Sequence, residues 1–241
     1  MFNRLITGEP SGADVSRRPG NPVGSRFTTP ATVEDAYFVG LWRADGYTWS
    51  SSIGISNTDG QLARWTADFL TRNCGPTRVR WRVYLPPGAE LPAWLEAIGR
   101  PYVVRPVQKA KQVSYHVYVN HRPFLRQVRG WVENLSRYPD RMIQAYFAGR
   151  FDGDGCVGTN SRWGARIVYG GAQEAEEDRC LLMRACEVEA RVYEYRAAKT
   201  FVLYVLRRHT PAFLNAIRPF SIKLGGVLDP VETELQATGA R

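Results

Sequence analysis

The sequence contains few of the residues that many hydrolases and metalloproteins use. Its 241 residues include only four cysteines and three histidines, which are Cys74, Cys156, Cys180, Cys186, His116, His121 and His209. No two cysteines form a Cys-x-x-Cys pair, and the histidines do not have the spacing of zinc ligands. We therefore expect reduced, buried thiols, with no zinc site.

The sequence also lacks a long apolar segment. No apolar run approaches the roughly 18 residues that a membrane span needs, so we expect no membrane partner. Residues 1–30 are rich in Gly, Pro, Ser and Arg and contain no apolar stretch of a secretory signal. They are expected to form a flexible leader, and the expected location is the cytoplasm, or an organelle matrix if the chain is organelle-encoded.

Basic residues outnumber acidic ones. The chain has 32 basic and 23 acidic residues, for a net charge of +9, and only four of the basic residues are lysine. The rest are arginines, which bind phosphate through two parallel hydrogen bonds and contact guanine edges well. Both halves of the chain carry excess positive charge, so the composition favours a polyanionic partner.

One segment of the sequence occurs twice. The stretch AYFVGLWRADGY at 36–47 is similar to AYFAGRFDGDGC at 145–156, with a constant offset of 109 residues. Tyr118-Val119 is followed by a Pro-Phe-Leu pattern, and Tyr204-Val205 by a similar one. Two matching pairs in the same order indicate a duplication. We expect repeats at 31–135 and 142–228, a linker at 136–141 and a tail at 229–241.

Hydrophobic periodicity predicts an α+β fold. Each repeat is expected to run helix, two strands, helix, two strands, helix, with a short helical insert in the first. In the first repeat the expected elements are Thr32–Arg43, Tyr47–Ser56, Gln61–Asn73, Arg78–Leu85, Pro92–Ile98, Tyr102–Gln108, Gln112–Val119 and Pro123–Leu135. In the second they are a helix through 145–154, strands within 156–169, a helix at 172–186, strands at 188–196 and 199–206, and a helix at 211–219.

The expected strand Arg78–Leu85 has one cationic face. Because side chains alternate along a strand, Arg78, Arg80 and Arg82 share a side, opposite an apolar face that includes Trp81. Aligned like charges repel unless an anion binds them. We interpret this face as a phosphate-binding surface.

The duplicated helices carry small residues one turn apart. Gly40 and Ala44 in the first copy match Gly149 and Gly153 in the second. Residues at i and i+4 share a helix face, and small ones allow two helices to approach closely. The two repeats are therefore expected to pack through these helices.

Each of these helices ends in Asp-Gly. Asp45 and Asp154 stand at C-terminal ends, where the helix already carries partial negative charge. If the helices pack side by side, the two carboxylates form an anionic pocket that a hard divalent cation would relieve.

The segments 38–46 and 147–155 resemble the two motifs of single-chain LAGLIDADG homing endonucleases, and the similarity extends over residues 32 to about 225. The resemblance implies two pseudo-symmetric αββαββα repeats that form a DNA-binding saddle from a pair of four-stranded antiparallel sheets. It also implies cleavage of both strands. Arg43 occupies the sixth motif position in the first copy, and Asp152 occupies it in the second, where we treat it as a secondary acid.

The resemblance assigns roles to individual residues. Asp45 and Asp154 would be catalytic and would bind Mg²⁺, with backbone oxygens of Ala44 and Gly153, and Ca²⁺ would support binding without cleavage. Family members carry a basic residue beside each scissile phosphate, for which Lys111 and Lys199 are the candidates. Candidate DNA contacts are Thr48, Ser50, Ser52, Arg78, Arg80, Arg82, Arg105, Lys109, Arg162, Arg166, Arg191 and Arg196.

The sequence thus predicts a monomeric, metal-dependent endonuclease that makes a double-strand break in a long double-stranded DNA site and is encoded within an intron or intein. Two alternatives with the same fold are an RNA maturase that binds intron RNA and a non-catalytic DNA-binding regulator. Both motif acids are present, which favours the nuclease.

Overall fold

The structure is a computed structural model that describes residues 29–47, 51–158 and 164–226. The first half of the chain forms α1 (Val33–Asp45), β1 (Gly46–Tyr47), β2 (Ser52–Asn57), α2 (Gly60–Cys74), the 3₁₀ turn η1 (Pro76–Arg78), β3 (Arg80–Leu85), α3 (Trp94–Ala97), β4 (Tyr102–Pro106), β5 (Ser114–Asn120) and α4 (Arg122–Glu133). After η2 (Leu135–Arg137), the second half forms α5 (Asp140–Asp154), β6 (Gly155–Val157), β7 (Ala165–Tyr169), α6 (Ala172–Cys186), β8 (Ala190–Tyr195), β9 (Thr200–Val205), η3 (Arg207–His209) and α7 (Thr210–Ile217).

The chain consists of two repeats, as the sequence predicts. The second repeat has the expected αββαββα order, and the first has the same order with α3 and β4 inserted. The N-terminus of α1 is fixed by a capping box: the Thr32 hydroxyl accepts from the Asp35 amide, and the Asp35 carboxylate accepts from the Thr32 amide. Helix α5 begins at Asp140, inside the range expected to be linker.

Each repeat contributes one sheet. The strand order is β1-β2-β5-β3-β4 in the first sheet and β6-β7-β9-β8 in the second. Two expectations for the first sheet are wrong. It has five strands rather than four, and β4 pairs with β3 in parallel because α3 carries the chain back to the starting edge.

The expected strand Tyr47–Ser56 is also wrong as a single strand. It forms the hairpin β1–β2, in which Tyr47 lies opposite Gly54 and Gly46 opposite Ile55. Tyr47 therefore shares a face with Gly54, whereas Ile53 and Ile55 point into the core. The alternation in the sequence did not reveal the reversal, because polar and apolar residues continue to alternate through it.

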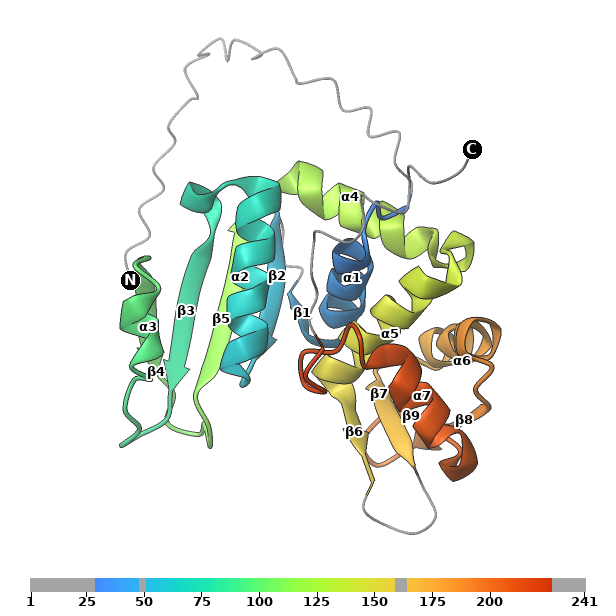
Figure 1. Ribbon diagram of the computed structural model, residues 1–241. Helices are drawn as coiled ribbons and strands as arrows, with labels where there is room; N and C mark the ends of the chain where they lie inside the picture. Colours follow the sequence, from blue (N-terminus) through green and yellow to red (C-terminus); the bar gives the residue numbers. More distant parts are fainter. Residues whose placement is uncertain (1–28, 48–50, 159–163, 227–241) are drawn as a thin grey trace, which may run out of the picture.

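Helices α1 and α5 lie together at the centre, with a sheet on either side of the pair (Figure 1). Both sheets extend past the C-terminal ends of these two helices, and α4 crosses near their opposite ends (Figure 1). Most residues of both helices are buried, including Phe38 and Phe147. The C-terminal ends of α1 and α5 are thus flanked by both sheets.

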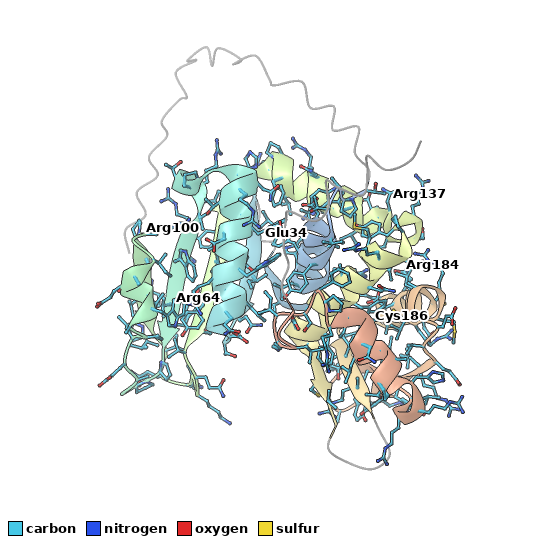
Figure 2. All side chains as sticks on the ribbon, in the orientation of Figure 1. Glu34, Arg64, Arg100, Arg137, Arg184 and Cys186 are labelled. Carbon is cyan, nitrogen blue, oxygen red and sulfur yellow. The ribbon has the colours of Figure 1, made fainter. Side chains whose placement is uncertain are left out.

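Arginine side chains on α2 connect it to α1 and to α3. Glu34 near the start of α1 accepts hydrogen bonds from Arg72 on α2, and Glu34 lies between these two helices in Figure 2. Arg64 on α2 lies over the ring of Trp94 at 5.1 Å. These arginines belong to the helical layer of the first repeat rather than to the sheet.

Two further observations concern the cysteines and membrane spans. All four cysteines are free, as expected, but Cys156 and Cys180 are exposed, so the expectation that all thiols are buried is wrong. Within the described ranges, no helix is long and apolar enough to cross a membrane.

Candidate active site between two helix ends

The two central helices touch backbone to backbone. A Cβ placed on Gly149 would lie 2.6 Å from the amide nitrogen of Leu41, and one on Gly40 would lie 2.9 Å from the amide nitrogen of Arg150. Each added Cβ would also overlap a carbonyl oxygen of the opposite helix, that of Tyr37 or Tyr146. The contacts are related by the 109-residue offset, so the prediction that small residues mediate packing of the repeats is confirmed.

This packing brings the two Asp-Gly ends together. A Cβ on Gly153 would overlap the Ala44 side chain and lie 3.0 Å from Oδ2 of Asp45. Asp154, the next residue, ends α5 as Asp45 ends α1. Both carboxylates therefore occupy one small region at the junction of the repeats.

The electrostatics of this region are unfavourable for two charges. Burial, together with repulsion from Asp45, raises the pKa of Asp154 from 3.8 to about 6. Burial also raises the pKa of Asp45, although a hydrogen bond from Asn57 opposes the shift. Asn57 Nδ2 donates to Asp45 Oδ2 at 2.6 Å, whereas no side chain in the described part of the chain donates to Asp154. The pair is asymmetric, and Asp154 is the less stabilised of the two.

A neighbouring cation is already neutralised by other carboxylates. Arg150 is 1% exposed and pairs with Glu174 at 3.2 Å and with Asp178 at 3.6 Å. Arg43 pairs with the same two acids, at 2.8 Å and 3.8 Å. These two arginines and two carboxylates sum to zero charge. Arg150 still lowers the pKa of Asp45 and of Asp154, but its charge is shared with Glu174 and Asp178.

Lys223 is a cation near both candidate acids that the sequence analysis missed. It lies in the segment after α7, and its attraction lowers the pKa of Asp45 and of Asp154. The one sequence feature that marks Lys223 is that lysine is rare in this arginine-rich chain, which has only four. Sequence position gave no further indication, because residue 223 lies 69 residues after Asp154 along the chain.

The lysines predicted to lie beside the scissile phosphates are both in exposed connections between strands. Lys111, like Lys109, is exposed in the connection between β4 and β5. Lys199 is exposed in the turn between β8 and β9, with a positive φ of 52°. The cations that act on Asp45 and Asp154 are Arg150 and Lys223 rather than these. Their role in phosphate binding stays a prediction.

Asp152 is not placed as a secondary metal-binding acid. Its side chain is 0% exposed and accepts hydrogen bonds from the hydroxyls of Tyr37, at 2.6 Å, and Ser221, at 2.5 Å. The backbone amide of Ile222 donates to it at 2.7 Å. These donors occupy its oxygens, so Asp152 joins segments of the fold.

The site suits a hard divalent cation. Two carboxylates, one of them without a protein donor, meet at helix ends whose last carbonyls also carry partial negative charge. The described residues contain no group of three or more His, Cys, Asp or Glu that could hold a metal. The protein would therefore supply Asp45, Asp154 and backbone oxygens, and the remaining ligands would come from water and a bound phosphate.

The first sheet presents a cationic and aromatic face. Arg80 lies opposite Tyr118, and Arg82 opposite His116, which places both arginines on the face that carries Tyr47. The Arg82 guanidinium lies 5.1 Å from the centre of the Tyr118 ring. No acidic side chain in the described ranges forms an ion pair with either arginine. Both are available to an external anion.

Other expected contacts in the first repeat are only partly on this face. Arg105, opposite Tyr84, lies on it. Arg78 does not continue the strand, because it ends the turn η1 before β3 begins. Ser52 is buried, and its hydroxyl donates to Asn120 Oδ1 at 2.5 Å. Thr48 and Ser50 lie outside the described residues.

The second sheet repeats the pattern. Arg191 lies opposite Tyr204, as Arg80 lies opposite Tyr118, so the two arginines are equivalent. Arg166 lies on the same face, and its Nε donates to Cys156 Sγ at 2.9 Å. Arg196 is almost fully exposed in the turn after β8, 3.6 Å from Glu194. Arg162 lies outside the described residues.

Comparison with known proteins bears on the fold. No protein-family model matches the sequence, and a search of curated proteins also finds no match. Solved structures do match. The structure of I-DmoI in complex with DNA and Mn has a TM-score of 0.54 and 15% identity, covering 81% of this chain and 98% of that one. Variants described as mesophilic forms of the homing endonuclease I-DmoI give 0.55 and 15%, covering 82% and 98%.

The N-terminal LAGLIDADG domain of WhiA gives a TM-score of 0.51 at 15% identity, covering 89% of this chain and 90% of that domain. The chain therefore has the LAGLIDADG fold, with α+β repeats and largely antiparallel sheets, and the expected fold class is confirmed. At these identities the likeness concerns the fold. The activity has to be argued from the site.

Proposed function

We propose that this protein is a site-specific DNA endonuclease that makes a double-strand break by metal-dependent phosphodiester hydrolysis. The observation that carries the proposal is the convergence of Asp45 and Asp154, one from each repeat, at the ends of two closely packed helices. A structural protein gains nothing from this arrangement, because burial and repulsion make it unfavourable.

The sheets support DNA as the substrate. Arg80, Arg82 and Arg191 lie on exposed sheet faces in both repeats. Guanidinium groups on strands bind phosphate oxygens or guanine edges. A variant of I-DmoI, which has the same fold, has been solved in complex with its target DNA in the presence of Mg.

The chemistry follows from the residues at the junction. Asp45 and Asp154 would hold Mg²⁺, which when bound activates water and stabilises negative charge on the attacked phosphate and the departing oxygen. The protein's own contribution is to fix the two carboxylates on rigid helices and to hold the phosphate backbone against them. A structure of I-DmoI with DNA and Ca exists, and we propose that Ca²⁺ supports binding here as well.

The two-fold arrangement within one chain fits a monomer acting on a long, asymmetric or pseudo-palindromic site, since each repeat supplies one sheet and one acid. We further propose that the chain is intron- or intein-encoded and cuts the allele that lacks the insertion, inside the cytoplasm or an organelle matrix.

The test is a cleavage assay on DNA that spans the flanks of the coding insertion joined without it. In Mg²⁺ the purified protein is expected to produce one double-strand break, and in Ca²⁺ to bind the same site without cutting. Binding of intron RNA with no cleavage of any DNA would replace the proposal by the maturase, and DNA binding without cleavage would replace it by the regulator.

A further inference from the structure

Helix α4 carries a row of arginines on its outer face. Arg122, Arg126 and Arg129 stand at positions i, i+4 and i+7 of the helix, and all three side chains are exposed. Residues at these spacings share one face, and at a rise of 1.5 Å per residue the row is about 10 Å long. Glu133, the only acid of α4, is its last residue. The outer face of α4 therefore bears three neighbouring positive charges, which we call the α4 arginine row.

The charges of the row are not balanced by the protein. No acid in the described ranges forms an ion pair with any of the three arginines, whereas Arg179 on α6 lies 2.6 Å from Glu176. Arg122 and Arg126 are four residues apart, so they repel each other. Arg122 also opens the helix, where the partial charge is already positive, and the first turn contains no acid. The row is therefore unfavourable for stability until an anion binds to it.

The fold does not require the row, because the equivalent helix of the second repeat is uncharged. Helix α7 also begins with proline near its N-terminus and has the sequence TPAFLNAI, without a charged residue. Each helix buries an aromatic side chain in the core, Phe124 in α4 and Phe213 in α7. The same packing is thus achieved without arginines, so the row serves the surface of α4.

The surroundings of the row indicate the class of its partner. The apolar face of α4, which includes Leu125 and Trp131, is buried in the core. None of the large hydrophobic side chains that are exposed in the described ranges lies on α4. A protein interface or a membrane-bound helix needs apolar surface as well as charge, whereas a nucleic-acid backbone is bound by charge and by guanidinium hydrogen bonds to phosphate. A row about 10 Å long spans about three phosphates of one DNA strand, which advance by about 3.4 Å each along the duplex axis.

The row is also remote from the candidate active site. Helix α4 crosses near the N-terminal ends of α1 and α5, whereas Asp45 and Asp154 stand at their C-terminal ends (Figure 1). Helix α1 has 13 residues, so its two ends are about 18 Å apart. The sheets extend away from α4, past the C-terminal ends of these helices (Figure 1). A straight duplex held on the sheets does not reach α4, so a phosphate on the row belongs to a second segment of nucleic acid.

We propose that the α4 arginine row binds the backbone of a second segment of duplex DNA, which allows the protein to pass from one segment to another without becoming free in between. The proposal goes beyond the proposed function and relies on it only for the first segment, which occupies the sheets. Duplex DNA is the partner because it is the polymer on which such a nuclease acts, and because the row consists of guanidinium groups alone, with no aromatic ring to stack on the bases of single-stranded RNA. Contacts to phosphate alone carry no sequence information and weaken steeply with salt.

The test follows the release of a labelled duplex that spans the joined flanks, in Ca²⁺, while unlabelled duplex of random sequence is added at increasing concentration. If the second segment binds before the first leaves, the release rate rises with the concentration of added duplex. We expect this rise for the parent, and a constant release rate when Arg122→Gln, Arg126→Gln and Arg129→Gln are combined. In the parent, the logarithm of the acceleration should fall against the logarithm of salt concentration with a slope of about three, one for each phosphate contact.

Two controls separate the charge of the row from other effects. Lysine at the same three positions keeps the charge and should retain most of the acceleration. Arg179→Gln removes one positive charge from α6 and should leave the acceleration unchanged, whereas Arg126→Gln alone should weaken it. The melting temperature of the combined glutamine variant should be no lower than that of the parent, because like charges are removed from the start of a helix. Loss of acceleration then does not reflect unfolding.

The outcomes keep this proposal apart from the nuclease proposal. A parent release rate that is independent of the added duplex would overturn the second binding surface and leave the nuclease proposal intact, and so would equal acceleration in the parent and the combined glutamine variant. Acceleration by duplex RNA but not by duplex DNA would also overturn it, because the row would then bind RNA. Failure of the nuclease proposal is detected separately, as absence of cleavage in Mg²⁺, since the release experiment in Ca²⁺ requires no reaction.

Discussion

Replacing Asp154 by Asn should stabilise the metal-free protein. The pKa of Asp154 is raised from 3.8 to about 6 by burial and by repulsion from Asp45. A difference of this size corresponds to about 3 kcal/mol between the two protonation states. Because the carboxylate is partly exposed, solvent screening reduces the effect, and we expect a gain of about 1 to 2 kcal/mol at neutral pH for the uncharged amide.

The same raised pKa predicts how the stability of the protein changes with pH. The folded pKa lies above the ordinary value, so the folded protein holds this proton more tightly than the unfolded chain does. The contribution of the protonated Asp154 carboxyl to the free energy of unfolding is therefore fully present below about pH 4. It is lost as the pH rises through about 6 and the carboxyl ionises. The difference between Asp154→Asn and the parent should be small at pH 4 and reach its full value by pH 7.

Thermal unfolding in a chelating buffer at several pH values measures this. For a chain of this length 1 kcal/mol corresponds to about 2–4 °C, so the melting temperature should rise by roughly 2–8 °C at pH 7.5. Asp68→Asn is the matched control, since the Asp68 side chain is 66% exposed, and it should have little effect. An Asp154→Asn variant that melts at or below the parent temperature at pH 7.5, with the same pH profile, would refute the proposed repulsion between the helix ends.

Three further predictions concern packing, binding and assembly. Gly149→Ala should destabilise the protein by several kcal/mol, because its Cβ would lie 2.6 Å from the Leu41 amide nitrogen. Gly130→Ala, with nothing within 4 Å of the added Cβ, should instead raise stability by about 0.5–1 kcal/mol. Denaturant unfolding measures both variants, and equal effects on the free energy of unfolding would contradict the helix packing. Arg80→Ala and Arg191→Ala should each weaken DNA binding and lower the salt slope by about one, measured by titration, while Arg64→Ala should not; unchanged binding in both sheet variants would exclude the sheet faces. Sedimentation should give a monomer of about 27 kDa, and a stable dimer at micromolar concentration would count against it.

The duplication made much of the fold predictable. An exact offset of 109 residues matched the two central helices, and glycine at 40 and 149 indicated close contact between them. The alternation in β3 identified which face carries Arg80 and Arg82, because the period of a strand is fixed by its geometry. Local periodicity was enough for these features.

Other features depended on contacts between distant segments. The parallel pairing of β4 follows from how α3 packs, which no local pattern encodes. The role of Asp152 depends on Ser221 and Ile222, about 70 residues further along the chain. Lys223 was missed for the same reason, since its effect on Asp45 and Asp154 depends on how the segment after α7 packs against α5.

Cleavage by Asp45→Asn and Asp154→Asn tests the central claim most directly. The parent and the two variants would be incubated in Mg²⁺ with DNA joined across the insertion point, and both strands would be mapped for new ends, with binding measured in parallel in Ca²⁺. We predict that the parent makes one double-strand break, and that both variants bind the same site with similar affinity but cut at least roughly 100-fold more slowly. Cleavage by both variants at the parent rate would contradict the assignment of the active site to the ends of α1 and α5.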